Sequence, residues 1–177
     1  MGKYFLINAF GKDKPGIVAE VSKILYENGF NLENSTMSKL ADEFTIMLVV
    51  YTEKEFTTDE VKKLFLPVED KLNLNIYVKE IDYKEEDKKN TLYKVIVYGG
   101  DKPGIVYKVA KLLAENNINI VDMTTEKAQD IYVLITDVEI PDSVDFEEFR
   151  AKIKQLQYDI DVDVSCEKIE VFELWKN

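Results

Sequence analysis

Apolar residues follow the same order of patterns twice along the chain. Two short runs rich in aromatic and β-branched residues, Tyr4–Phe10 and Leu92–Tyr98, predict strands. After each run, apolar residues recur at spacings of three and four, which predicts a helix with one buried face. The apolar positions of the two helices are Ile17, Val18, Val21, Ile24 and Leu25, then Ile105, Val106, Val109, Leu112 and Leu113.

Two strands, a second helix and a closing strand complete each pattern. In the first copy these are Asn31–Lys39, Phe44–Tyr51, a helix from near Thr57 and Leu74–Ile81. In the second copy they are Asn119–Lys127, Ile131–Ile135, a helix from about Ser143 and a strand from Ile160 continuing to Leu174. The order βαββαβ, found twice, predicts an α+β fold. We expect two ferredoxin-like domains, each an antiparallel sheet with both helices on one face.

A repeated hexapeptide fixes the domain organisation. The sequence DKPGIV occurs at Asp13–Val18 and again at Asp101–Val106. An ungapped alignment of residues 13–39 with 101–127 gives 14 identities in 27 positions. Between the copies, residues 83–90 form a charged run without apolar periodicity, which is typical of a linker. We therefore predict two domains of one design, residues 1–82 and 91–177.

The hexapeptide stands where a strand gives way to a helix. We expect Asp13 and Asp101 to accept the free N–H groups of the first helical turn, with Pro15 and Pro103 near the first helical position. The glycine at the fourth position, Gly16 in the first copy, lets a ligand approach the backbone closely. A helix N-terminus with free donors suits a small carboxylate.

Charge and composition narrow the possible functions. The chain has 34 acidic and 23 basic side chains, a net charge of −11, and one arginine, Arg150, so direct nucleic-acid binding is not expected. It has no histidine, which removes the commonest general base and transition-metal ligand, and this counts against an enzyme. No metal or cofactor is expected. The single Cys166 cannot form an internal disulfide, and no apolar run is long enough for a membrane span or signal, so we expect a cytoplasmic protein.

An asparagine recurs fifteen positions after each glycine, at the entrance to the second strand. These are Asn31 and Asn119. In a βαββαβ unit this strand begins at the end of the sheet opposite the N-terminus of the first helix. The glycine turn and the asparagine of one copy could therefore share a ligand only if two domains pair. This favours a site between domains.

The pattern D-K-P-G, an apolar-spaced helix and N-[IL] at the next strand resembles the ACT domain, a ligand-sensing module of amino-acid metabolism. The resemblance covers nearly the whole chain, twice, and two such modules without a catalytic domain are similar to the glycine cleavage system transcriptional repressor family. It implies a free amino acid, glycine or another small one, bound at a domain interface. It also implies a protein partner such as a transcriptional activator or metabolic enzyme, and a homodimer. The implied ligand-binding residues are Asp13, Lys14, Pro15, Gly16, Ile17, Asn31, Leu32, Asp101, Lys102, Pro103, Gly104, Ile105, Asn119 and Ile120.

Two functions stay open at this point. The first is a non-enzymatic regulator that binds a small amino acid and thereby modulates a protein partner. The second is a ligand-independent dimerisation or adaptor module that docks on a metabolic enzyme. In the second case the hexapeptide would only start a helix, and the asparagines would only satisfy backbone groups where the chain turns.

Overall fold

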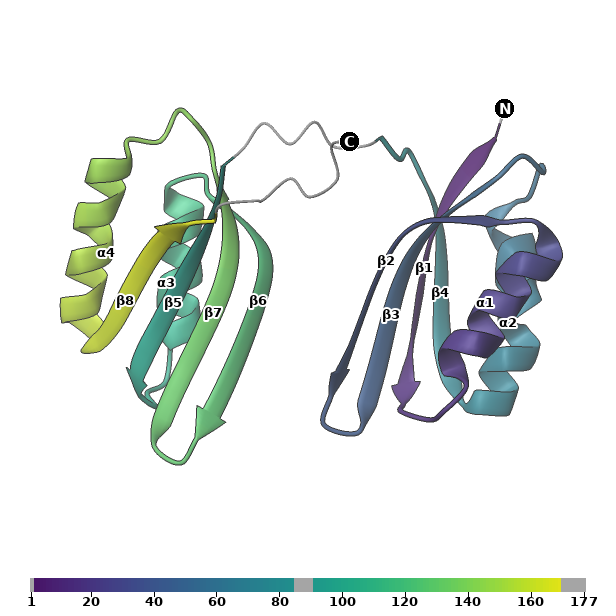
Figure 1. The fold of residues 1–177 in the computed structure, drawn as a ribbon, viewed down its shortest axis with the longest axis horizontal. Helices are drawn as coiled ribbons and strands as arrows, with labels where there is room; N and C mark the ends of the chain where they lie inside the picture. Colours follow the sequence, from purple (N-terminus) through teal and green to yellow (C-terminus); the bar gives the residue numbers. More distant parts are fainter. Residues whose placement is uncertain (1, 85–90, 170–177) are drawn as a thin grey trace, which may run out of the picture. The chain divides into compact units, whose positions relative to one another are not determined.

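The computed structural model describes residues 2–84 and 91–169 (Figure 1). The chain divides into two compact units, Met1–Glu85 and Glu86–Asn177, called unit 1 and unit 2 below. Most of the predicted linker, residues 85–90, lies outside the described residues, and so does the end of the predicted last strand, from residue 170 onward.

Both units have the predicted order of elements. Unit 1 consists of β1 Lys3–Lys12, α1 Ile17–Asn28, β2 Asn31–Leu40, β3 Glu43–Thr52, α2 Thr58–Leu72 and β4 Leu74–Ile81. Unit 2 consists of β5 Thr91–Gly100, α3 Ile105–Glu115, β6 Asn119–Ala128, β7 Ile131–Ile140, α4 Phe146–Ile160 and β8 Val162–Lys168. The sheet orders are β2-β3-β1-β4 and β6-β7-β5-β8, and every pairing is antiparallel. The α+β, ferredoxin-like prediction is confirmed.

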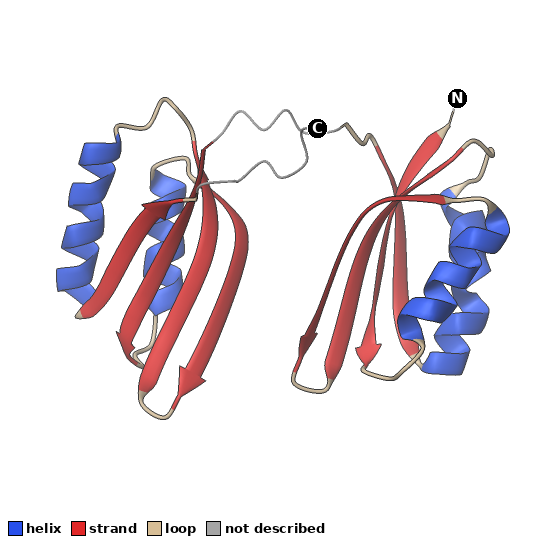
Figure 2. Cartoon of the chain, viewed as in Figure 1, coloured by secondary structure: helices blue, strands red, loops and turns tan. Residues whose placement is uncertain are grey.

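In each unit both helices cover one face of the sheet (Figure 2). In β1 the alternate residues Phe5, Ile7 and Ala9 are fully buried beneath α1 and α2. Phe65 of α2 and Phe149 of α4 each provide a large, fully buried side chain to the core of their own unit, one helical turn apart in the repeat. Within residues 2–84 and 91–169, no helix covers the other face of either sheet. This face consists of alternate, partly exposed strand residues.

The helix ends follow local chemistry. Gly29 ends α1 in the left-handed region at φ 75°, and Asn117, just after α3, has φ 55°, as expected for residues that tolerate this conformation. Thr57 and Glu60 form the predicted capping box at the start of α2. Helix α2 also continues through Pro67 without a break.

Three local predictions were wrong. Helix α4 begins at Phe146 rather than Ser143, because the Asp145 carboxylate accepts from the amides of Glu147 and Glu148 and sets the N-cap there. Ile160 ends this helix instead of opening β8, since the left-handed Asp161 separates the two elements. Val18 and Val106 lie on the exposed side of their helices, so the buried stripe is narrower than predicted.

Candidate functional site

The hexapeptide forms a left-handed turn rather than a side-chain-capped helix start. Gly16 and Gly104 are the N-cap residues, with φ values of 97° and 90°, and no side chain caps either helix within the described residues. The predicted capping by Asp13 and Asp101 was therefore wrong, and so was the place of the prolines. The reason is that the left-handed glycine delays the start of the helix. The first helical residue is Ile17 or Ile105, four positions after the aspartate.

Each aspartate instead ties the turn to the β-hairpin beside it. The Asp13 carboxylate accepts from Lys39 Nζ at 2.7 Å, and its amide donates to the Asp42 carbonyl at 2.8 Å. In unit 2, the same pair of contacts joins Asp101 to Lys127 and to the carbonyl of Asp130. The start of the turn is thus held at the far end of β2 or β6.

Each lysine of the hexapeptide ties the turn to the second helix. Lys14 Nζ donates to the Leu72 carbonyl at the end of α2, at 3.3 Å. Lys102 Nζ donates to the Ile160 carbonyl at 3.4 Å and to the Asp161 carboxylate at 2.7 Å. The hydrogen bond and positive charge of Lys102 lower the pKa of Asp161 from 3.8. A cation at this position also complements the negative end of the helix dipole.

The amide groups at the start of α1 and α3 are open to a ligand. The first intrahelical bonds run from the amide of Glu20 to Gly16 and from that of Lys108 to Gly104, both at 2.9 Å. The amides of the three residues before each donor therefore have no intrahelical acceptor. A methyl group built on either glycine would have no atom within 4 Å. Because the side chains of Ile17 and Ile105 are buried, only their backbone amides could contact a ligand.

The structure does not bring the glycine turn and the asparagine of one unit together. Asn31 pairs with Tyr51, which pairs with Tyr4 near the start of β1, whereas the turn follows the other end of β1. The length of β2 separates them by about 30 Å. Asn119 stands at the same end of β6, opposite Glu139. Each unit alone therefore holds two half-sites.

The two asparagines have different surroundings. Both are exposed, and a β-bulge follows each of them, between Leu32 and Asn34 and between Ile120 and Asp122. Leu32 is 53% exposed, whereas Ile120 is half-buried. Asn31 shares its face of the sheet with a tyrosine and Asn119 shares its face with a carboxylate, so the two half-sites are not chemically equal.

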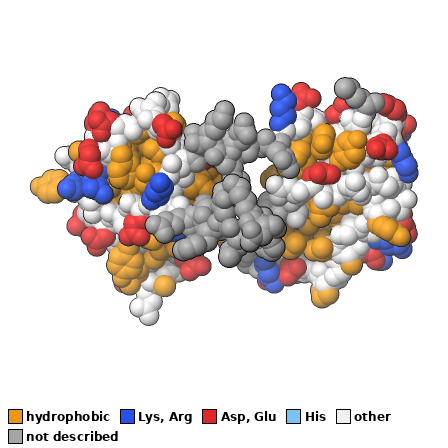
Figure 3. Space-filling view, turned by 45° about the horizontal axis from the view of Figure 1, so that its top comes forward, with side chains coloured by type: hydrophobic (Ala, Val, Ile, Leu, Met, Phe, Trp, Pro, Cys, Tyr) orange, Lys and Arg blue, Asp and Glu red, His pale blue; other side chains and the backbone are white. Residues whose placement is uncertain are grey.

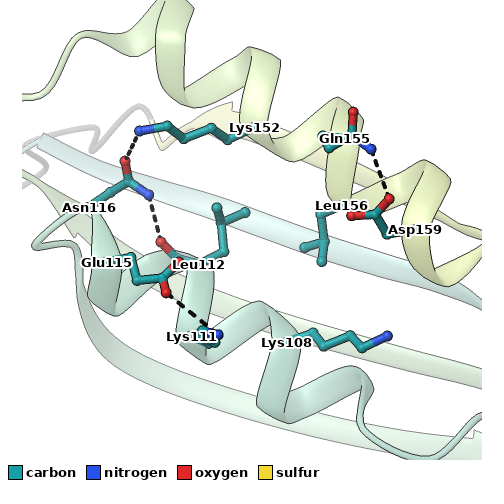
Figure 4. A pocket seen from close by; sticks show the side chains of 9 residues that line it. All are labelled: Lys108, Lys111, Leu112, Glu115, Asn116, Lys152, Gln155, Leu156 and Asp159. Carbon is teal, nitrogen blue, oxygen red and sulfur yellow. Dashed lines mark hydrogen bonds and ion pairs between the residues drawn. The ribbon is translucent and has the colours of Figure 1, made fainter.

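A groove that the sequence did not predict runs between α3 and α4 (Figure 4). It encloses about 380 Å³, and Leu112 and Leu156 lie in it among polar side chains. Lys152 Nζ donates to the Asn116 side-chain oxygen at 2.8 Å at one end, and Gln155 donates to Asp159 at 2.8 Å at the other. It contains none of the predicted site residues. In the sequence, the groove is indicated only by the helix periodicity that places both leucines inward.

An ion pair crosses the corresponding place in unit 1. Lys71 Nζ lies 2.6 Å from Glu20 Oε1, and this lysine lowers the pKa of Glu20 from 4.5. The equivalent residues in unit 2, Asp159 and Lys108, have the opposite charges. The two units thus share the turn and differ in the charges on the helix face.

On the face shown in Figure 3, lysines are scattered among carboxylates and apolar side chains. Burial raises the pKa of the Cys166 thiol to about 11, which suppresses the reactive thiolate. Between residues 2 and 84 and between 91 and 169, no helix has the length and apolar character needed to cross a bilayer.

A doubled βαββαβ fold with a left-handed glycine turn before each first helix defines a tandem module of the ferredoxin-like class. Family models described as ACT domain match residues 3–79 and residues 87–163. The chain belongs to the ACT domain family and carries two ACT domains in tandem, as the sequence resemblance implied.

Comparisons with individual proteins agree with this assignment. The chain is 28% identical over 142 residues to the glycine cleavage system transcriptional repressor of Escherichia coli, covering 75% of this chain and 73% of that one. It is 36% identical over 80 residues to a UPF0237 protein of Methanococcus maripaludis, covering 45% of this chain and 89% of that one. A crystal structure of an unknown protein from Galdieria sulphuraria superposes with a TM-score of 0.81 at 22% identity. The superposition covers 96% of this chain and 100% of the Galdieria chain, and this likeness supports the assigned fold.

Proposed function

We propose that this protein is a cytoplasmic, non-enzymatic regulator that binds a small amino acid between two ACT domains and thereby alters its affinity for a protein partner. The observation that carries the proposal is the open glycine turn, which occurs in both units with the same two tethers. Its unpartnered backbone amides suit the ligand's carboxylate. The favourable helix dipole adds about 0.3–1 kcal/mol for an anion at such a place.

Edge-to-edge pairing of two domains would complete the site. Strands β2 and β6 are edge strands, and all ten residues of β2 are exposed. If two such edges pair in antiparallel fashion, the first residue of one strand lies opposite the last residue of the other. Asn31 of one domain would then approach the Asp13–Lys39 end of its partner, where the glycine turn lies. This pairing would join the two half-sites that one unit keeps apart.

The start of β6 in unit 2 favours a zwitterionic ligand more than the start of β2 in unit 1 does. Glu139 lies directly opposite Asn119 in the sheet, whereas Tyr51 occupies the equivalent place beside Asn31. A carboxylate near the asparagine complements the ammonium of an amino acid whose own carboxylate binds the turn of the partnering domain. We therefore expect the site that contains Asn119 to bind a free amino acid more tightly than the site that contains Asn31.

The proposed partner is a protein, such as a transcriptional activator or a metabolic enzyme. A net charge of −11 with a single arginine makes direct contact with nucleic acid unfavourable. The Escherichia coli relative is named as a transcriptional repressor, which supports a role in the control of amino-acid metabolism. The ligand would change the affinity for the partner by about 5- to 150-fold, the usual range of allosteric coupling.

A thermal-shift screen of the twenty amino acids tests the proposal. A ligand present at 100 times its dissociation constant should stabilise the protein by about 2.7 kcal/mol, because it binds only the folded state. Gly16→Val and Gly104→Val should remove this shift, because a branched side chain fills the open turn and disfavours the positive φ of 97° or 90° that the turn requires.

The asparagines provide a second arm of the experiment. Asn119→Ala should weaken binding more than Asn31→Ala, and Glu139→Gln should weaken it without changing the melting temperature of the ligand-free protein. The regulator proposal fails if no amino acid changes the melting temperature. It also fails if the double variants Gly16→Val with Gly104→Val and Asn31→Ala with Asn119→Ala bind as tightly as the wild type. A ligand-independent adaptor is then the better description.

A further inference from the structure

The four central rows of the helix-free face of the unit 1 sheet are almost without charge, and one pair of opposite charges, Lys12 across from Glu43, lies at the end of this face. The buried residues of β1 point toward the helices, so Tyr4, Leu6, Asn8 and Phe10 point to the opposite face. Each of these residues forms a row of four with its neighbours on β2, β3 and β4. Among the sixteen described residues of these rows, Lys79 alone is charged, although charged residues make up 32% of the chain. At that frequency, about five would be expected.

This face is also apolar at its centre. Leu6 and Val49 lie side by side and half-buried, while Met47, Phe10 and Tyr77 are 42%, 46% and 59% exposed. A shallow hollow of about 230 Å³ lies over Leu6, Met47 and Val49. A contiguous apolar surface bordered by uncharged polar residues is typical of a protein interface.

The same face of unit 2 shows that the fold does not require this composition. The rows through Leu92, Lys94, Ile96 and Tyr98 have one basic and six acidic residues. The acidic residues are Asp122, Glu126, Asp137, Glu139, Asp163 and Glu167. Asp137 stands where unit 1 has Val49, and Lys94, which lies 2.5 Å from Asp137, stands where unit 1 has Leu6. Unit 1 thus has an apolar contact at the centre of its face, where unit 2 has an ion pair.

We propose that the helix-free sheet face of unit 1 is a dimer interface, occupied by the same face of a second copy of this chain. A face with few charges at its centre can meet its own copy with little repulsion, and a two-fold arrangement closes at the dimer. Two unit 2 faces would bring six carboxylates against six. A unit 1 face against the unit 2 face of another copy would bury unpaired carboxylates on an apolar surface, which is costly. Pairing of like faces of unit 1 avoids both penalties.

The size of the face sets the strength of this dimer. Four strands at about 4.8 Å spacing and seven residues at about 3.3 Å give roughly 440 Å² per copy, or roughly 900 Å² for the pair. This lies at the low end of specific interfaces and is typical of reversible association. We therefore expect a dimer in rapid equilibrium with monomer at micromolar concentrations. It leaves the backbone edges of β2 and β6 free for the edge pairing in the proposed ligand site, and the two surfaces share only Asn31, at the rim of the face.

Sedimentation velocity of the full chain from about 1 to about 200 µM tests this interface, since an interface this small is expected to associate reversibly. Val49→Asp should raise the dissociation constant at least about tenfold, because each copy would bury a new charge. This aspartate already occurs at the equivalent place in unit 2, so the sheet tolerates it. The double variant Leu6→Lys with Val49→Asp recreates the ion pair of unit 2 and should also be monomeric.

The matched control is Ile135→Asp, which places the same charge on the helix-free face of unit 2 and should leave the dimer intact. A wild type that stays monomeric over the whole range would overturn the proposal. It would equally be overturned by a dimer that tolerates Val49→Asp, or by one that is lost with Ile135→Asp. Amino-acid binding measured on the folded Val49→Asp variant separates this proposal from the ligand site, because loss of the dimer need not abolish the thermal shift.

Discussion

Lys102 closes the C-terminal end of α4 by donating a 2.7 Å hydrogen bond to the carboxylate of Asp161. The lysine belongs to the second hexapeptide and the aspartate follows the last helical residue, 59 positions later. In unit 1, Lys14 occupies the same place, but Asn73 stands where unit 2 has Asp161. One repeated lysine therefore has a titratable partner in unit 2 and a backbone carbonyl in unit 1.

This difference makes the effect of removing Lys102 depend on pH. The pKa of Asp161 is lowered in the folded state from 3.8, first by its hydrogen bond to Lys102 and then by the lysine's charge. The stability that the pair contributes is therefore fully present above pH 3.8 and is lost as the pH falls through the lower, folded-state pKa. Lys102→Met should cost most near neutral pH, and the cost should shrink as the solution is acidified.

Urea denaturation of wild type and variant between about pH 7 and about pH 3 measures this difference, since linkage ties its slope to proton uptake. Lys14→Met is the matched control, and its cost should stay constant over the same range because the Leu72 carbonyl does not titrate. A constant cost for Lys102→Met would show that the lysine acts only through backbone carbonyls.

The ion pair between Asp13 and Lys39 should be weak but measurable. Their side chains are 33% and 55% exposed, so solvent screens the 2.7 Å contact. A double-mutant cycle with Asp13→Asn and Lys39→Met should give a coupling of about 0.2–1 kcal/mol that falls when salt is added. The cycle with Asp101→Asn and Lys127→Met should agree, because the contact recurs in unit 2. A coupling that high salt leaves unchanged would contradict an electrostatic tether.

Cys166 should react slowly while unit 2 is folded. With a pKa of about 11, caused mainly by desolvation, roughly one thiol in a thousand is ionised at pH 8. We expect a disulfide reagent to modify it about two orders of magnitude more slowly than free cysteine, and at the free rate once urea unfolds the unit. Rapid modification without urea would show that the thiol is more exposed than its contacts with α4 indicate.

The fold could be predicted because its signals are local and occur twice. The alternation of Phe5, Ile7 and Ala9 and the three-to-four spacing of Ile17, Val21 and Leu25 each reflect one buried face. The start of α1 could not be predicted, because aspartate and proline are frequent at helix starts. Here the left-handed Gly16 moves the helix start beyond both of them.

The parts of the site that depend on tertiary contacts could not be predicted from the sequence. The contact of Asp13 with Lys39 joins residues 26 positions apart, and only the closed β-hairpin brings them together. The separation of the glycine turn from Asn31 was predictable, because strand order alone fixes which end of the sheet each occupies. The difference between Glu139 and Tyr51 beside the two asparagines required the strand register.

The capping box of α2 makes the last prediction. The Thr57 hydroxyl accepts from the Glu60 amide at 3.2 Å, and the Glu60 carboxylate accepts from the Thr57 amide at 2.8 Å. Thr57→Ala should destabilise the protein by about 1 kcal/mol in urea denaturation, because an amide of the first turn loses its acceptor. Thr57→Ser keeps the hydroxyl and should retain most of the stability. Equal losses for both variants would mean that the methyl group, rather than the hydroxyl, holds the start of this helix.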